Sequence, residues 1–129
     1  LIRACDILIA SESFARYFSS GDNFKAAEKI FLLGPEIVVI PLGNKGCLCK
    51  SMDKSFIQPA FKIKVVDTTG AGDLYAAGFL YGYSNGFSLD KCGLFGSILA
   101  GKVIEDVGAR MAEGKWQEAK ELIGSVSAD

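Results

Sequence analysis

Histidine does not occur in this sequence of 129 residues, and its absence excludes several large classes of enzyme. Serine or cysteine nucleophiles that depend on a histidine base, and most hydrolytic zinc sites, require the imidazole ring. An excess of one charge sign is also lacking, because 14 basic residues are balanced by 15 acidic ones. The basic surface typical of nucleic-acid-binding proteins is therefore not predicted.

Long apolar runs are lacking as well. No run approaches the roughly 20 residues that span a bilayer, and no charged segment followed by an apolar core opens the chain. The remaining composition, with 50% hydrophobic and 22% charged residues, is that of an ordinary globular protein. We therefore expect a soluble, cytoplasmic protein without nucleic-acid or membrane partners.

Cysteine is present at four positions, Cys5, Cys47, Cys49 and Cys92. Only Cys47 and Cys49 are close together, and on a strand their side chains would face the same way. A zinc site would need two more ligands, and the C-x-x-C pattern of redox proteins is missing. These cysteines are therefore expected to be reduced and buried, with a metal site or a disulfide framework as the alternative.

Short apolar runs alternate with segments of helical periodicity along the whole chain. Strands are expected at residues 6–10, 36–42, 47–52 and 62–66, and helices at residues 11–18, 23–32, 72–83, 88–107 and 116–123. Asp22 is a suitable cap for the second of these helices. This alternation predicts an α/β protein with a largely parallel sheet covered by helices.

The sequence Asp-Thr-Thr-Gly-Ala-Gly-Asp at residues 67–73 lies between a predicted strand and a predicted helix. Its glycines allow a sharp turn and a close approach to a ligand, and the free N–H groups at the helix start favour an anion such as phosphate. Asp73 would add a carboxylate that can accept the proton of an attacking hydroxyl. The alternative is an ordinary first-turn aspartate beside turn glycines.

This heptapeptide matches in full the D-T-x-G-A-G-D signature of the ribokinase-like carbohydrate and nucleoside kinases, the PfkB family, which the chain resembles. The resemblance implies that Asp73 is the catalytic base and that Gly70, Ala71 and Gly72 form the anion hole. It further implies that the protein has a ribokinase-like fold and uses ATP and Mg²⁺. The expected reaction transfers the γ-phosphoryl of ATP to a hydroxymethyl group of a sugar or nucleoside.

The segment after the second predicted strand is similar to the family's L-G-x-x-G turn, on which ATP rests. The resemblance also places a nucleotide contact on the second helix after the base. The residues expected to bind ATP are Leu42, Gly43, Asn44, Gly46, Gly72 and Ser97. Both glycine turns follow predicted strands, and the resemblance implies that they meet in one crevice, whereas independent turns are the alternative.

A monovalent-cation site is implied by the same resemblance. Asp67 and Thr69 lie where some members hold K⁺, and the backbone carbonyls of Val103, Asp106 and Gly108 would complete the site. Residues 100–104 and 108–110 look most like the adenosine-kinase-like branch. As ordinary structure, Val103, Asp106 and Gly108 are a helix end and its glycine cap.

Two departures from the family pattern affect the expected nucleotide and metal sites. Many members have N-x-x-E where this chain has Ser11 to Phe14, a segment that helps to organise magnesium and phosphate. Glu12 is in the wrong register to replace the missing glutamate. Pro41 replaces a threonine whose hydroxyl can reach the nucleotide, and proline has no N–H to donate.

Family members are considerably longer, and the resemblance covers their C-terminal part. We therefore expect residues 1–129 to be the C-terminal, ATP-binding part of a kinase domain, with the N-terminal acceptor-binding and lid part absent. The isolated chain would then bind ATP weakly and turn over substrate hardly at all. The alternatives are a complete small domain, or a non-catalytic nucleotide-binding or structural module; a homodimer is an open question.

Overall fold

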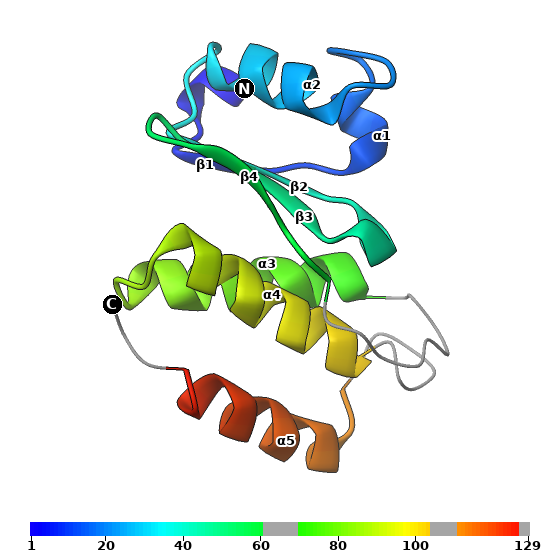
Figure 1. The fold of residues 1–129 in the computed structure, drawn as a ribbon, viewed down its shortest axis with the longest axis vertical. Coiled ribbons are helices and arrows are strands. Elements are labelled where there is room, and N and C mark those ends of the chain that lie inside the picture. Colours follow the sequence, from blue (N-terminus) through cyan, green and yellow to red (C-terminus); the bar gives the residue numbers. More distant parts are fainter. Residues whose placement is uncertain (61–69, 104–110, 127–129) are drawn as a thin grey trace. The chain divides into compact units, whose positions relative to one another are not determined.

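The computed structural model describes residues 1–60, 70–103 and 111–126 (Figure 1). The chain divides into two compact units, Leu1–Pro59 and Ala60–Asp129. The first unit contains a sheet and the second contains helices in its described residues. Across the described parts of the chain, no helix is both long and apolar enough to cross a membrane.

The sheet of the first unit has four strands in the order β1-β2-β3-β4. These are β1 (Ile7–Ile9), β2 (Ile37–Pro41), β3 (Cys47–Lys50) and β4 (Ser55–Gln58). β1 and β2 are parallel, whereas β2 pairs with β3, and β3 with β4, in antiparallel directions. The α/β class is thus confirmed, but the described sheet is mixed instead of largely parallel. Within this sheet, only the β1–β2 connection is long enough to hold the crossover that parallel strands require.

The last strand of the sheet is not predicted by the sequence pattern. β3 ends two residues earlier than predicted, and a tight turn follows in which the Ser51 N–H donates to the Lys54 carbonyl at 2.8 Å. The turn residues Met52 and Asp53 lack the glycine that usually marks such a hairpin. β4 is therefore recognisable only through its pairing with β3.

Two helices, α1 (Glu12–Ala15) and α2 (Asn23–Phe31), connect β1 to β2. The Lys25 N–H donates to the Asp22 carboxylate at 3.0 Å, which confirms the predicted cap of α2. α1 is a single turn, shorter than the predicted helix at residues 11–18, because the chain continues after Ala15 in tighter i to i−3 turns.

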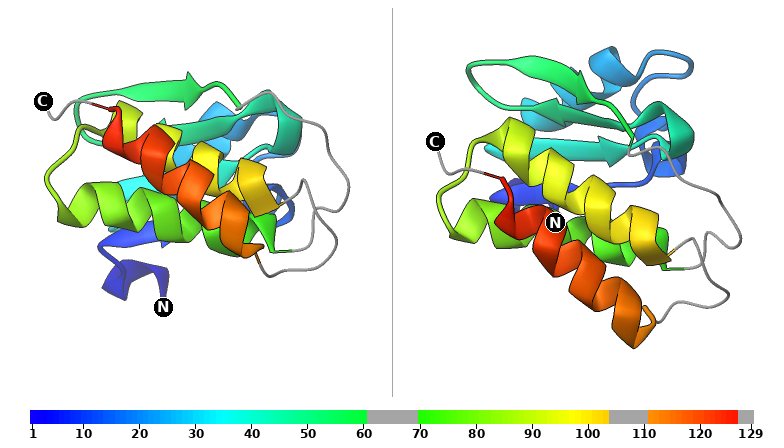
Figure 2. Two further views of the ribbon diagram at one scale, coloured as in Figure 1. Left: turned by 90° about the horizontal axis from the view of Figure 1, so that it is seen from below. Right: turned by 60° about the horizontal axis from the view of Figure 1, so that its bottom comes forward.

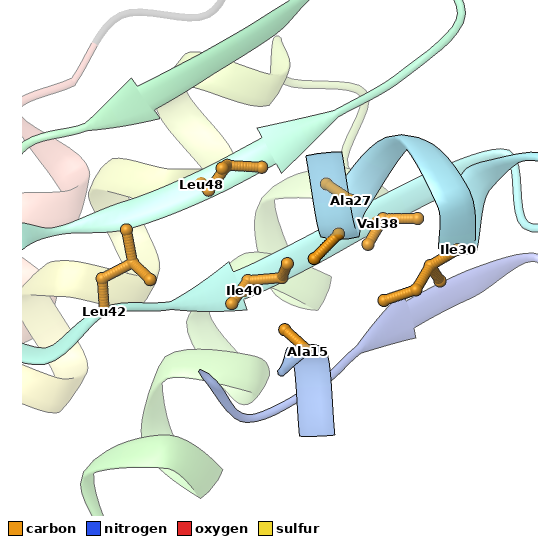
Figure 3. Close-up of a cluster of buried hydrophobic side chains, with 8 residues drawn as sticks. Ala15, Ala27, Ile30, Val38, Ile40, Leu42 and Leu48 are labelled. Atoms are coloured by element: carbon orange, nitrogen blue, oxygen red, sulfur yellow. The ribbon is translucent and has the colours of Figure 1, made fainter. Parts of the chain in front are cut away.

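The core of the first unit lies between these helices and one face of the sheet. Figure 3 shows Ala15 of α1 and Ile30 of α2 directed toward Val38 and Ile40 of β2. Alternate residues of β2 share this face because strand side chains have a period of two. The buried cluster consists of Ala15, Ala26, Ala27, Ile30, Val38, Ile40, Leu42 and Leu48.

The described part of the second unit consists of α3 (Ala71–Ser84), α4 (Leu89–Val103) and α5 (Glu113–Gly124) (Figure 2). α3 confirms the predicted helix at residues 72–83, and α5 begins three residues before the predicted one at residues 116–123. The predicted continuation of α4 to residue 107 lies outside the described residues, as does the strand at residues 62–66.

α3 and α4 pack unusually closely because glycines face the opposite helix. A Cβ at Gly78 would lie 2.5 Å from the Phe95 carbonyl oxygen, and one at Gly96 would lie 2.8 Å from the Tyr75 carbonyl oxygen. Cys92, Phe95, Leu99 and Val103 of α4 are buried and form an apolar stripe that belongs to the core. α5 is joined to α4 by an ion pair of 2.7 Å between Lys102 Nζ and Glu118 Oε2.

Candidate functional site

The start of α3 has the backbone geometry of an open helix N-terminus. Gly70, the residue before the helix, has φ 81° and ψ −3°, a left-handed conformation that glycine adopts without steric cost. Its carbonyl accepts the first helical hydrogen bond, from the Leu74 N–H at 3.0 Å. The amides of Ala71, Gly72 and Asp73 precede this bond, so the helix gives them no carbonyl partner. Glycine has no side chain to cap them, and no hydrogen bond from these N–H groups to another described residue is present.

The side chains of this first turn leave the amides accessible. A Cβ built on Gly72 would meet nothing within 4 Å, so a ligand can approach the backbone there. Asp73 is exposed and occupies the first turn of α3, as the heptapeptide predicts. An anion bound at these amides would therefore lie in the same helical turn as the carboxylate of Asp73.

The predicted potassium site uses residues of the heptapeptide and of the segment that begins at the end of α4. Asp67 and Thr69 lie outside the described residues, as do Asp106 and Gly108. Val103 is described, and its side chain is buried in the apolar cluster of the second unit. A potassium site that uses these residues stays a prediction.

The predicted nucleotide turn of the first unit is a short 3-10 helix, η2 (Gly43–Lys45). The turn is closed by a hydrogen bond of 2.8 Å from the Leu42 N–H to the Gly46 carbonyl. Gly43 has φ 61° and Gly46 has φ 103°, conformations that explain both glycines. Gly43 and Asn44 are exposed, whereas the Leu42 side chain packs in the core and supports the turn from inside.

Ser97, the predicted nucleotide contact on α4, is only 7% exposed. It belongs to the second unit, whereas η2 belongs to the first. The expected meeting of the two glycine turns in one crevice stays a prediction, and so does each expected nucleotide contact.

Pro41 leaves the end of β2 intact. The hydrogen bond between Leu42 and Gly46 sets the alternation of the antiparallel ladder, so Pro41 and Cys47 form a pair without hydrogen bonds. The Pro41 nitrogen therefore faces the side of β1, beyond the last bond from the Ala10 N–H to the Val39 carbonyl at 2.9 Å. A proline is tolerated at such a position because no ladder bond is lost.

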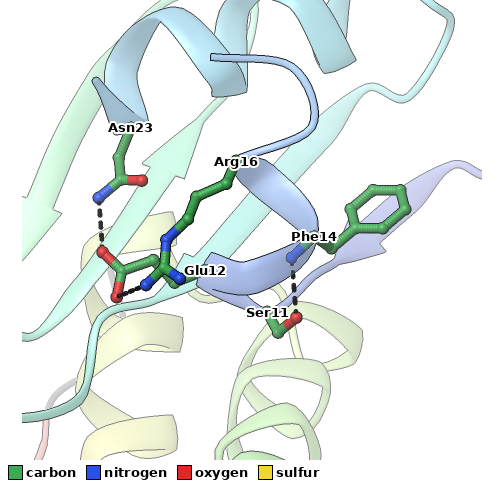
Figure 4. Close-up of polar contacts among 5 residues, drawn as sticks. All are labelled: Ser11, Glu12, Phe14, Arg16 and Asn23. Carbon is green, nitrogen blue, oxygen red and sulfur yellow. Dashed lines mark hydrogen bonds and ion pairs between the residues drawn. The ribbon is translucent and has the colours of Figure 1, made fainter. Parts of the chain in front are cut away.

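The segment that corresponds to the family's N-x-x-E pattern does not fit a magnesium site. The Ser11 hydroxyl accepts a hydrogen bond from the Phe14 N–H at 3.2 Å and so caps α1 (Figure 4). Phe14 packs against the core of the first unit. Glu12 accepts a hydrogen bond from the Asn23 amide at 3.0 Å and lies 4.0 Å from the Arg16 guanidinium. The hydrogen bond from Asn23, 11 residues away, is not indicated by any pattern in the sequence.

The cysteines are free, and three of them are buried, as expected. Burial raises the pKa of the Cys92 thiol to about 11, because desolvation disfavours the thiolate. Among the residues that the structure describes, no group of three or more histidine, cysteine, aspartate or glutamate side chains could hold a metal ion.

Comparison with known proteins finds a sugar kinase and a nucleoside kinase among the relatives of this chain. An uncharacterized sugar kinase of Archaeoglobus fulgidus is 40% identical over 110 residues, which cover 85% of this chain and 44% of that protein. A nucleoside kinase of Methanocaldococcus jannaschii is 39% identical over 89 residues, which cover 68% of this chain and 30% of that protein.

Solved structures that match this chain in fold are named as ribokinases. Arabidopsis thaliana ribokinase in complex with ribose and ATP matches with a TM-score of 0.82 and 25% identity, over 98% of this chain and 43% of that one. An E. coli structure named ribokinase II, in complex with ATP and Mg²⁺, matches in fold with a TM-score of 0.80 at 20% identity, over 97% of this chain and 41% of that one.

The chain thus spans less than half of the length of each of these four proteins. The fold they share is the ribokinase-like α/β fold, of which this chain has a part. Residues 1–115 match the family described as pfkB family carbohydrate kinase. With nearly the whole chain matched in sequence and the fold matched as well, the chain belongs to the pfkB family of carbohydrate kinases.

Proposed function

We propose that this chain is the C-terminal, ATP-binding part of a kinase that phosphorylates a hydroxymethyl group of a sugar or nucleoside. The observation that carries the proposal is the start of α3. There, Gly70 in a left-handed conformation opens a helix whose first turn presents free amides and the exposed Asp73. Because the chain spans less than half of its relatives, the acceptor would be bound mainly by parts of the intact kinase outside this chain.

In the proposed reaction, Asp73 accepts the proton of the acceptor hydroxyl as its oxygen attacks the γ-phosphorus of ATP. The bond from that phosphorus to the β–γ bridging oxygen breaks, and ADP leaves. The amides of Gly70, Ala71 and Gly72 stabilise the negative charge on the transferred group. Preorganised backbone donors suit this task because they need no rearrangement during the reaction.

ATP is proposed to rest on η2, with Gly43, Asn44 and Gly46 against the nucleotide and Ser97 as a further contact. The exposed Gly43 and Asn44 support this placement, because a ligand can reach their backbone. Mg²⁺ is proposed to accompany the nucleotide phosphates. K⁺ near Asp67 is a separate part of the proposal.

The acceptor is proposed as a sugar or a nucleoside, with adenosine as the narrower choice. Relatives named as a sugar kinase and as a nucleoside kinase have nearly the same identity to this chain, so neither class is favoured. A panel of nucleosides and sugars therefore has to decide the acceptor.

A non-catalytic nucleotide-binding module is the second candidate. It is favoured by the segment after β1, where Ser11 and Phe14 provide no carboxylate for magnesium. Such a module would bind ATP or ADP without transferring a phosphoryl group.

The Asp73→Asn variant separates the two candidates. It should be tested in the intact protein that contains this chain, with ATP and the acceptor panel. If Asp73 is the base, turnover should fall roughly 10²- to 10⁴-fold while ADP affinity changes little. The matched control is Asp90→Asn, because Asp90 is a first-turn aspartate of α4. If wild type and Asp73→Asn were equally inactive while both bound ADP, the kinase assignment would be lost.

A further inference from the structure

The carboxylate that follows β1 is held by two neighbouring side chains. Glu12 Oε2 accepts a hydrogen bond from Asn23 Nδ2 at 3.0 Å, and Glu12 Oε1 lies 4.0 Å from a guanidinium nitrogen of Arg16. Figure 4 shows both partners directed at this carboxylate. Asn23 is the first residue of α2, and Glu12 is the first residue of α1. The side chain therefore joins the starts of two helices.

Ser11 and Phe14, which correspond to the asparagine and glutamate of the family pattern, have structural roles. The Ser11 hydroxyl is used as the cap of α1. Phe14 contributes a ring, 5.5 Å from the ring centroid of Phe18, and packs against the core. A phenyl ring has no oxygen ligand to give, so only Glu12 could supply a carboxylate in the segment from Ser11 to Phe14.

Magnesium binding by Glu12 would be opposed by its surroundings. Mg²⁺ takes oxygen ligands in near-octahedral geometry and is usually bound through one or two carboxylates and substrate phosphates. The Arg16 guanidinium, 4.0 Å from Glu12, would repel a divalent cation at the same carboxylate. The hydrogen bond from Asn23 would also have to be given up or shared.

We propose that Glu12 joins α1 to α2 and is not a ligand of magnesium, so that the segment from Ser11 to Phe14 gives Mg²⁺ no ligand and leaves it to the phosphates of the nucleotide. The segment after β1 is thus a structural connection in this chain and not a metal-organising one. The part of the inference that concerns the nucleotide rests on the proposed function. The part that concerns Glu12 does not, and it can be tested without nucleotide.

The first test measures Mn²⁺ binding to the chain by electron paramagnetic resonance, with Mn²⁺ as the probe for Mg²⁺. Wild type is compared with Glu12→Gln, and Glu28→Gln is the matched control, since Glu28 also sits in an ion pair, 3.2 Å from Lys50. We expect the three Mn²⁺ affinities to agree within about threefold. A larger loss that is specific to Glu12→Gln would overturn the inference.

The same titration with ADP distinguishes the two proposals. If ADP does not bind to wild type, the proposed function fails, but the comparison without nucleotide still decides the role of Glu12. If ADP binds and carries Mn²⁺ with it, Glu12→Gln should leave this joint binding unchanged within about threefold. A larger specific loss in this arm also overturns the inference.

The second test measures the connection itself by thermal unfolding. Glu12→Ala and Asn23→Ala should each lower the midpoint by roughly 2–6 °C, because each removes the same hydrogen bond. The double variant should lose clearly less than the sum of the two single losses. Additive losses, or no loss, would show that Glu12 does not join the helices.

Discussion

The starts of α1 and α3 are helix N-termini with opposite arrangements. α1 begins after Ser11, whose hydroxyl accepts a hydrogen bond from the Phe14 amide and so satisfies one donor of the first turn. α3 begins after Gly70, which has no side chain to cap the amides of its first turn. Because uncapped amides are the groups that bind anions, only the second arrangement is suited to the proposed phosphate site.

The residues inside the first turn reinforce this difference. The second helical position is Ser13 in α1 and Gly72 in α3, and the third is Phe14 in α1 and Asp73 in α3. Phe14 packs against the core, whereas Asp73 is exposed. α1 is also a single turn of four residues, too short for aligned peptide dipoles to accumulate. A helix start can bind a ligand when its own residues leave the first-turn amides without partners.

A bulky side chain at the second helical position should separate the two helix starts most strongly. Gly72→Leu places a side chain in the open space beside the amides of α3, so ADP affinity should fall by at least about tenfold, or about 1.4 kcal/mol. Ser13→Leu, at the equivalent position of α1, should leave ADP affinity unchanged. Both affinities can be measured by isothermal titration calorimetry.

The control for these two variants is the midpoint of thermal unfolding. Gly72→Leu should have the same midpoint as wild type. A Cβ at this position meets nothing within 4 Å, and leucine replaces a glycine inside a helix. If Gly72→Leu bound ADP as well as wild type, the α3 amides would not be part of the nucleotide site.

Alanine at the residue before each helix should destabilise the two helices for different reasons. Gly70→Ala puts a Cβ on a backbone with φ 81°, which costs about 1–2 kcal/mol of stability. Ser11→Ala removes the cap of α1, which costs about 1 kcal/mol. Chemical denaturation measures both free energies of unfolding.

The contrast is sharpened by replacing each capping residue with the other. Ser11→Gly should recover part of the loss seen in Ser11→Ala, because glycine is a tolerable cap. Gly70→Ser should not recover the loss of Gly70→Ala, because serine is also strained at this φ. Equal recovery at both positions would show that the conformation of Gly70 is not what the helix start depends on.

Helix starts are predictable from the sequence where the signal is local. The Asp22 cap of α2 and the beginning of α3 near Gly72 follow from residues within one turn, and both are confirmed. β4 escapes prediction because its four residues form a strand only when paired with β3. The predicted end of α1 is wrong, because the N–H groups of Tyr17 and Phe18 donate to carbonyls three residues back, in tighter turns that end the α-helix.

The candidate site shows the same limit. The heptapeptide predicts Asp73 and its neighbouring amides as the candidate site, because this short signature specifies residue types at adjacent positions of one turn. The hydrogen bond between Glu12 and Asn23 is not predictable, since it joins residues 11 positions apart through the packing of two helices. The close approach of Gly78 to the Phe95 carbonyl is not predictable for a similar reason, because the sequence does not show which residue a glycine contacts.

Inorganic phosphate should give the smallest effect and the most direct view of the open helix start. If the α3 amides bind phosphate with a dissociation constant of about 10 mM, about 50 mM phosphate would stabilise the folded chain by about 1 kcal/mol. Phosphate also stabilises proteins without a specific site, so the midpoint of thermal unfolding must be compared with that of Gly72→Leu and with chloride at equal ionic strength. The part of the shift that Gly72→Leu loses and Ser13→Leu keeps belongs to α3. Equal shifts in all three proteins would show that the first turn of α3 has no phosphate site of its own.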